Sequence, residues 1–182
     1  MIHRVLSCLL LLAAALPAQE SRREIVNYAS NPGQDAKANS DSVPDVYAIS
    51  GRFERIVTLR FKFDTDLLAG LQKMVGQEKI RHAVILAGAG SVRGYHIHQV
   101  SNRVFPSKNM YVKDPIAQAD LIGMNGYIID GKVHAHVTLA TPDRAFGGHL
   151  EPGTPVFTFA IVTLGVLNEA ADLSRADDKT YR

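Results

Sequence analysis

The stretch that decides the fold is GYIIDGKVHAHVTLA, residues 126–140. Asp130 and Gly131 lie between two apolar runs, and Asp-Gly favours the two-residue turn of a β-hairpin. After this turn every second residue is apolar: Val133, Ala135, Val137 and Leu139. Because strand side chains alternate between two faces, these four are expected to point toward the core. The stretch therefore predicts two antiparallel strands, the second of them buried on one face only.

The opposite face of the second strand carries His134, His136 and Thr138. Two residues apart on a strand, the two imidazoles project in parallel from Cα atoms about 7 Å apart. His149 follows FGG, whose glycines allow a sharp turn and a close approach of the backbone. Three imidazoles with an open fourth position are typical of a catalytic zinc site, although copper, iron and nickel also bind imidazole. The candidate ligands of a divalent metal, with zinc expected, are His134, His136 and His149.

A second interpretation of this face stays open. An HxH pair alone is a weak signal, because polar side chains on the exposed face of a strand need no further role. Another pair, His96 and His98 in GYHIHQV, falls on a predicted strand with Ile97 between them. For this second pair the favoured interpretation is that both histidines lie on a solvated face or at a subunit interface. They could also join the same site, because neighbouring strands could bring the rings close. Asp143 and Glu151 are near His149 in the sequence, but the pattern singles out neither as its partner.

Residues 1–18 have the parts of an export signal. A positive start, MIHR, precedes the apolar run VLSCLLLLAAAL, and LPA ends in the small residue that signal peptidases require. The run is too short to span a bilayer comfortably, so a cleavable signal is expected rather than an anchor. The mature protein is therefore expected to be secreted or periplasmic, without a transmembrane segment. Cleavage would remove Cys8, the only cysteine, and with it any disulfide, thiolate nucleophile or thiolate ligand.

The charge of the chain bears on its partners. The net charge is +2, and Arg4 is the only formal charge in the signal, so the mature chain would carry +1. A nearly neutral protein has no broad electrostatic attraction for nucleic acid. Nucleic acid is therefore not expected as a partner of the exported chain.

The rest of the chain divides into a polar leader or linker at residues 19–47, one domain at 48–167 and a charged, flexible tail at 168–182. Apolar residues at helical spacing predict a helix from about residue 66, with Asp64 or Thr65 as its N-cap and Gly76 near its end. Strands are predicted for RIVTLRFKF, HAVILAGAG, GYHIHQV, ADLIGMNGYII, KVHAHVTLA and VFTFAIVTLGVL, and a loop for TPDRAFGGHLEPGTP. One helix among about six strands, several joined by hairpins, indicates an α+β domain with a mainly antiparallel sheet.

The glycine-rich stretch GAGSVRG, residues 88–94, has two competing interpretations. It resembles a dinucleotide-binding loop, but its glycine spacing differs by one residue and a strand pattern follows instead of a helix. The helix terminus that would bind the phosphates is therefore missing. A tight turn between two strands is predicted instead. Ser91 does not lie in a G-x-S-x-G nucleophile motif, so no serine hydrolase is indicated.

The order of these motifs resembles the PPC (plants and prokaryotes conserved) domain family. The resemblance rests on FDTDLLAGLQKMVGQEKIRHAVILAGAGSV, DLIGMNGYIIDGKVHAHVTLA and FGGHLEPGTPVFTFAIV, with HxHxxLA followed by GGHL as its most specific part. It implies an α+β domain with a central, mainly antiparallel sheet flanked by helices, assembled as a homotrimer. It also implies that His134, His136 and His149 correspond to a family metal site.

The same resemblance implies DNA binding as a possible function, because bacterial members of the family are often described as DNA-binding proteins. Plant relatives carry AT-hook segments and act on DNA in the nucleus, but no RGRP core of an AT-hook occurs in this chain. Cupins, which also use an HxH motif, fit less well, because here PG follows His149 and the expected glutamate after HxH is replaced by TLAT. Three hypotheses result: an exported metal- or ligand-binding protein, with or without enzymatic activity; a DNA-binding or regulatory protein; and a structural assembly domain whose histidines line a subunit contact.

Overall fold

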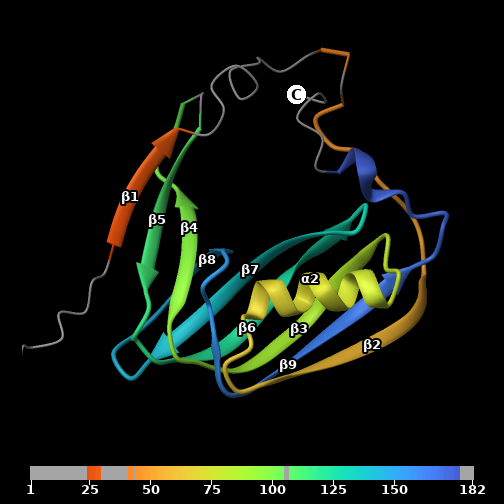
Figure 1. Ribbon diagram of the computed structural model, residues 1–182. Coiled ribbons are helices and arrows are strands. Elements are labelled where there is room, and N and C mark those ends of the chain that lie inside the picture. Colours follow the sequence, from red (N-terminus) through yellow and green to blue (C-terminus); the bar gives the residue numbers. More distant parts are fainter. Residues whose placement is uncertain (1–23, 30–40, 43, 105–106, 177–182) are drawn as a thin grey trace, which may run out of the picture.

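The structure is a computed structural model that describes residues 24–29, 41–42, 44–104 and 107–176. Within these ranges, nine strands form one sheet in the order β1-β5-β4-β8-β7-β6-β3-β9-β2, and every neighbouring pair is antiparallel (Figure 1). The strands are β1 (Glu24–Ala29), β2 (Phe53–Lys62), β3 (Ala83–Val92), β4 (Tyr95–Val100), β5 (Lys108–Asp114), β6 (Ala119–Ile129), β7 (Lys132–Thr141), β8 (Arg144–Leu150) and β9 (Val156–Leu167). This confirms the α+β class and the antiparallel sheet.

The β6–β7 hairpin forms as its sequence predicts. Ile129 pairs with Lys132, and the two residues between them have positive φ angles, 47° at Asp130 and 73° at Gly131. Positive φ at both central positions is the type I′ turn, whose twist matches that of the strands. The alternation predicted for β7 is also confirmed, because Ala135, Val137 and Leu139 are buried.

The helix α2 (Leu67–Gln77) lies across one face of the sheet (Figure 1). It buries Leu67, Leu71 and Val75 in the same apolar cluster as the inward residues of the strands. Its N-cap is Asp66, not Asp64 or Thr65, and the Asp66 side chain accepts a hydrogen bond from the Ala69 N–H. It is the only α-helix in the described residues, where the family resemblance had suggested several. The face of the sheet opposite α2 is therefore not covered by an α-helix of the described chain.

Three strands were not predicted from the sequence. Strand β8 occupies part of the predicted loop TPDRAFGGHLEPGTP, and β5 lies in a stretch without clear alternation. Strand β1 lies in the predicted leader and pairs with β5. A short 3-10 helix, η1 (Leu173–Arg175), lies in the predicted tail. The predicted export signal, residues 1–18, lies outside the described residues.

The tight turn predicted within GAGSVRG forms at its end, at Arg93 and Gly94, and not at its first glycines, Gly88 and Gly90. Strand β3 continues through them to Val92, and the chain reverses at Arg93 and Gly94 before β4. A Cβ added at Gly90 would lie 2.3 Å from the Phe159 carbonyl oxygen, so the close passage of β9 explains a glycine there. These glycines serve strand packing, and nothing in their geometry provides a phosphate loop.

Candidate metal centre

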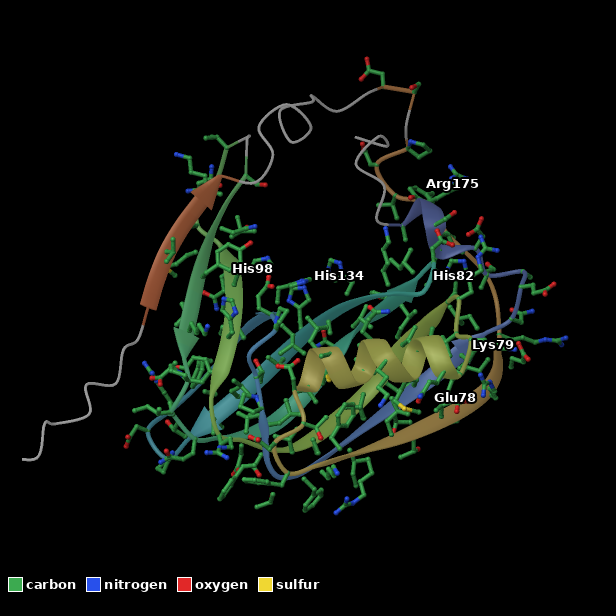
Figure 2. All side chains as sticks on the ribbon, in the orientation of Figure 1. Glu78, Lys79, His82, His98, His134 and Arg175 are labelled. Atoms are coloured by element: carbon green, nitrogen blue, oxygen red, sulfur yellow. The ribbon has the colours of Figure 1, made fainter. Side chains whose placement is uncertain are left out.

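The candidate ligands come from three strands that lie side by side. His98 of β4 pairs with His149 of β8, and His149 in turn pairs with His136 of β7. The three residues therefore form a row across the sheet, on one face because paired residues of antiparallel strands share a face. His134 lies two residues before His136 and points to the same face. Figure 2 shows His98 and His134 on this part of the sheet.

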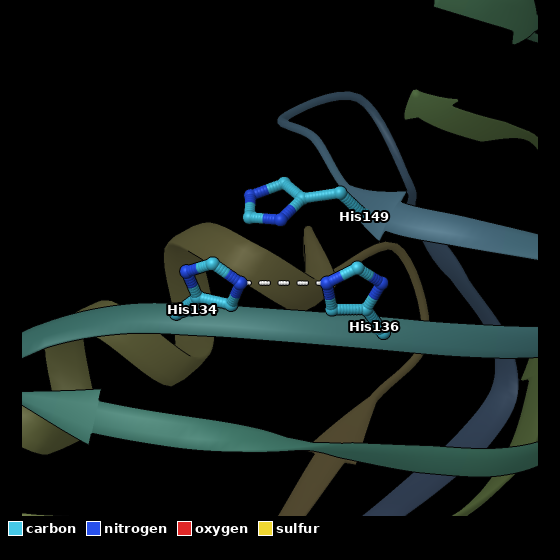
Figure 3. A group of neighbouring side chains, drawn as sticks. All are labelled: His134, His136 and His149. Carbon is cyan, nitrogen blue, oxygen red and sulfur yellow. Dashed lines mark hydrogen bonds between the residues drawn. The ribbon is translucent and has the colours of Figure 1, made fainter. Parts of the chain in front are cut away.

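The three predicted ligands converge. One ligand nitrogen from each of His134, His136 and His149 lies within 4.8 Å of the other two. The Nε2 atoms of His134 and His136 are 3.4 Å apart, and a nitrogen of the His149 ring points toward the gap between them (Figure 3). The His149 ring is nearly perpendicular to both other rings, at 87° and 86°. One nitrogen from each of the three rings therefore lies in the same small region of the sheet surface.

One separation in this cluster matches a tetrahedral metal ion. Zinc–nitrogen bonds of about 2.0–2.1 Å place two ligand nitrogens about 3.3–3.4 Å apart in a tetrahedron. The 3.4 Å between the Nε2 atoms of His134 and His136 is therefore the separation that two ligands of one zinc ion have. His136 is exposed and the other two are partly buried, which leaves one side of the cluster open to solvent. The residues fit a three-histidine site with an open fourth position.

Two glycines allow β8 to come close enough. A Cβ added at Gly147 would lie 2.1 Å from the Val137 carbonyl oxygen, and one at Gly148 would lie 2.4 Å from the His98 carbonyl oxygen. Real Cβ atoms do not approach backbone so closely, so any other residue would push β8 away from β7 or β4. The expected close approach through FGG is confirmed, but the glycines lie within a strand and not in a sharp turn.

The electrostatics keep two of these histidines neutral. Burial, together with the neighbouring imidazoles of His98, His134 and His136, lowers the pKa of His149 to about 4. Burial also lowers the pKa of His136, with His134 and His98 adding to the effect. Metal ions bind the neutral imidazole, so His136 and His149 need not release a proton at neutral pH.

The structure adds Glu151, which the sequence pattern did not single out, and brings in His98 from the second HxH pair. His98 Nδ1 lies 2.6 Å from Glu151 Oε1, and the His98 ring stacks on His149 with centroids 4.5 Å apart. Ligand atoms of His98, His149 and Glu151 also lie within 4.8 Å of one another, which makes them a second, overlapping group able to hold a metal. The other side of His98 faces the ring of Tyr111, at 4.9 Å.

His96 lies apart from this cluster. Its ring Nδ1 is 2.8 Å from the Pro152 carbonyl oxygen, and its backbone N–H donates a hydrogen bond to Thr154 Oγ1. Of the second HxH pair, the structure thus brings only His98 to the candidate centre. The buried Ile97 between them confirms that both histidines point away from the core.

The part of the chain that the structure describes holds no helix long and apolar enough to cross a membrane.

The fold and the histidine cluster together define a single-domain α+β protein with a candidate metal centre on its antiparallel sheet. The chain belongs to the Plants and Prokaryotes Conserved (PCC) domain family, whose model matches residues 48–168. This confirms the PPC resemblance drawn from the motifs. The matched range is also close to the domain predicted at residues 48–167.

Solved structures share this fold. A PPC protein from Pyrococcus horikoshii is 26% identical, with a TM-score of 0.55, and the match covers 68% of this chain and 85% of that one. A metal-containing protein from Archaeoglobus fulgidus is 18% identical, with a TM-score of 0.56 and coverage of 69% and 95%. A candidate DNA-binding protein from Bacteroides thetaiotaomicron is 14% identical, with a TM-score of 0.52 and coverage of 63% and 80%. At such identities the last two show the fold alone.

One curated relative is much longer. The bifunctional protein GlmU of Synechococcus sp. (strain JA-3-3Ab) is 25% identical over 111 residues, which are 60% of this chain and 17% of that protein. The chain therefore matches about a sixth of the length of this relative.

Proposed function

We propose that this protein is an exported, homotrimeric metal-binding protein in which His134, His136 and His149 hold one divalent ion, with zinc expected. The observation that carries the proposal is the convergence of three ligand nitrogens within 4.8 Å, with two of them 3.4 Å apart. The name of the Archaeoglobus relative, a metal-containing protein of similar fold, agrees with it. When bound, a zinc ion with an open position would polarise a carbonyl group or activate water.

The protein's own residues have separate tasks in this proposal. Strand β7 fixes His134 and His136 in parallel, and the glycines before His149 let its ring reach them. Glu151 holds His98 in place, and the stacked His98 ring restrains the His149 ring from one side. A carboxylate accepts and does not donate, so the hydrogen bond fixes a proton on Nδ1 of His98.

The test is metal content by mass spectrometry after the purified mature chain has been loaded with zinc and dialysed. One zinc per chain is expected for the wild type and for His96→Ala, whose ring lies outside the cluster. The His134→Ala/His149→Ala double variant is expected to retain none. Equal, near-zero zinc in all three proteins would refute the site and favour the structural hypothesis.

Single variants distinguish the two overlapping groups. If the three-histidine group is the site, His136→Ala loses zinc and Glu151→Gln keeps it, because Glu151 belongs only to the second group. The opposite pattern would assign the ion to His98, His149 and Glu151. Circular dichroism of each variant shows whether a loss of metal comes from unfolding.

A bare apolar face supports the homotrimer. On the side of the sheet away from the core, β2 and β9 expose Ile56, Phe159 and Ile161. Phe159 and Ile161 are two residues apart on β9 and share this face, and neighbouring exposed apolar side chains are typical of surfaces that bind another protein. Light scattering is expected to give three times the mass of the mature chain, and Ile161→Glu is expected to reduce it. A wild-type protein that is monomeric at micromolar concentration would refute this part.

Export is tested separately. The full chain, expressed in a bacterium with a periplasm, is expected to lose residues 1–18 and to appear outside the cytoplasm. Mass spectrometry of the N-terminus reads the cleavage site. An uncleaved cytoplasmic product would reject export and make DNA accessible to the protein.

DNA binding is the second candidate, and the name of the Bacteroides neighbour is the observation that favours it. Binding through phosphates weakens steeply as salt rises. Fluorescence anisotropy with duplex DNA from 20 mM salt upward tests this candidate. No binding at the lowest salt would exclude it for the mature chain.

A further inference from the structure

A cavity lies beside one of the candidate ligands. It has a volume of about 680 Å³, and its wall includes His134 of β7 and Tyr127 and Ile129 of β6. Tyr127 pairs with His134 across the two strands, so their side chains stand next to each other on one face. Clefts of about 300–1,000 Å³ are the usual size of small-molecule sites. Of the three candidate ligands only His134 lines this space, so a small molecule held there would meet the candidate metal centre at His134.

The opposite wall is built from two segments that are distant in the sequence. One is the stretch before β2, with Val46 and Tyr47, and the other contains Leu173 of η1. The two segments are tied together, because the Tyr47 hydroxyl donates to the Arg175 carbonyl and the Arg175 guanidinium lies 5.2 Å from the Tyr47 ring. Figure 2 shows Arg175 at this end of the molecule. Leu173 is buried, which anchors η1 to the domain.

The lining is mostly apolar and aromatic. Val46 is 86% exposed and Tyr127 is 49% exposed, so the cavity is open to solvent and apolar surface at its rim is uncovered. The ionisable side chains other than tyrosine in this wall are His134 and Asp45. An apolar wall favours a ligand with an apolar body, and tyrosine rings favour a flat one. The carboxylate of Asp45 disfavours a second negative charge on the same ligand.

We propose that this cavity binds a small molecule with a flat apolar body and a single oxygen donor, such as a carboxylate, which reaches the metal ion beside His134. The proposal rests on the proposed function, because the donor needs the metal held by His134, His136 and His149. It adds the ligand class: aromatic monocarboxylates and related carbonyl compounds. The body would contact Tyr127 and Val46, and the donor would take the open coordination position.

The probe is 2-naphthoate, whose fluorescence reports binding, and 2-methylnaphthalene has the same body without the donor. With zinc-loaded protein, 2-naphthoate is expected to bind at least tenfold more tightly than with metal-free protein. 2-Methylnaphthalene is expected to bind equally to both forms. A dicarboxylate, 2,6-naphthalenedicarboxylate, is expected to bind more weakly than 2-naphthoate because of Asp45.

A matched pair of variants locates the probe. Val46 and Val104 are both exposed, at 86% and 75%, and only Val46 lines the cavity. Val46→Asp is expected to weaken 2-naphthoate binding at least tenfold, and Val104→Asp is expected to leave it unchanged. Tyr127→Ala is expected to weaken it while zinc content stays at the wild-type level.

Two outcomes would overturn the proposal. Equal binding by Val46→Asp and Val104→Asp would show that the probe does not occupy this cavity. Equal binding of 2-naphthoate with and without zinc would show that the cavity does not act with the metal. A failure of the proposed function looks different: no zinc is retained, but 2-methylnaphthalene still binds the wild type and not Val46→Asp. That result would overturn the metal half of the proposal and leave an apolar binding site.

Discussion

His98 Nδ1 lies 2.6 Å from Glu151 Oε1, and the two side chains are only 18% and 21% exposed. This contact joins β4 to the residue that follows β8, and it holds His98 against His149. A hydrogen bond to a charged group in a partly buried place contributes about 1.5–3 kcal/mol, more than a solvated one. Glu151 thus supports the candidate centre although the sequence pattern does not single it out.

We therefore expect Glu151→Ala to lower the free energy of unfolding by about 1–3 kcal/mol, because it leaves His98 without its acceptor. Glu151→Gln is expected to lose less, since its amide oxygen still accepts. Urea denaturation measures both. The matched control is Glu78→Ala: Glu78 pairs with Arg55 at 2.8 Å on the surface and is expected to contribute less than about 1 kcal/mol. Equal losses for Glu151→Ala and Glu78→Ala would contradict the role given to Glu151.

A second prediction concerns the protonation of His149. In the metal-free protein, an NMR titration is expected to place the pKa of His149 at about 4, because burial and the nearby imidazoles disfavour its charged form. His98→Ala is expected to raise that pKa, since it removes a repelling neighbour and admits water. A His149 midpoint at 6.5 or above in the wild type would contradict the packing described.

The same shift determines how stability changes with pH. The unfolded chain binds a proton at His149 near the ordinary pKa of 6.5, whereas the folded chain binds it only near 4. The contribution of His149 to the free energy of unfolding is therefore fully present above about pH 6.5, and it is lost as the pH falls from there toward 4. Denaturation at pH 7 and pH 5 is expected to show a lower stability at pH 5 for the wild type. His149→Ala is expected to show a smaller difference.

A third prediction tests the glycines of β8. Gly147→Ala places a Cβ 2.1 Å from the Val137 carbonyl oxygen, so β8 must move away from β7. We expect the free energy of unfolding to fall by about 1–3 kcal/mol, as at other overpacked sites. Zinc binding is expected to weaken as well, because His149 is displaced. Thermal denaturation and zinc titration measure the two effects.

The control for this variant is Gly76→Ala in α2, where a Cβ would meet nothing within 4 Å. Alanine is a better helix former than glycine, so Gly76→Ala is expected to stabilise the protein by about 0.5–1 kcal/mol. Wild-type stability and zinc affinity in Gly147→Ala would show that β8 does not need its glycine.

A fourth prediction concerns Asp66, which connects α2 to the loop after β8. Its Oδ1 caps the helix at the Ala69 N–H, and its Oδ2 accepts from the N–H groups of Gly153 and Thr154, at 2.7 and 2.9 Å. Asp66→Ala removes all three hydrogen bonds, and we expect the free energy of unfolding to fall by about 3 kcal/mol. Asp66→Asn is expected to lose less because one oxygen still accepts, and chemical denaturation ranks the two variants. A loss below about 0.5 kcal/mol for Asp66→Ala would contradict this connection.

The sequence by itself determined the features that depend on near neighbours along the chain. Asp130-Gly131 defines a turn, the alternation after it orients His134 and His136, and the apolar spacing from Leu67 to Val75 defines α2. The turn follows from the backbone preferences of Asp-Gly, and the strand and the helix follow from periods of two and 3.6 residues, all of which a short stretch of sequence contains. The glycines before His149 indicated how it could approach the other two histidines, and the family motifs extended these local features to the fold.

Only the tertiary structure decided which side chains meet. His98 pairs with His149, which lies 51 positions further along the chain. A pattern in a short stretch of sequence cannot predict a pairing over that distance. The same holds for Glu151 beside His98 and for the cavity between Tyr127 and the segment around Val46. Strand β8 escaped prediction because its glycines, which resemble a turn in the sequence, are required by close strand packing. Contacts between distant strands depend on sheet order and register, which the burial of the whole core selects.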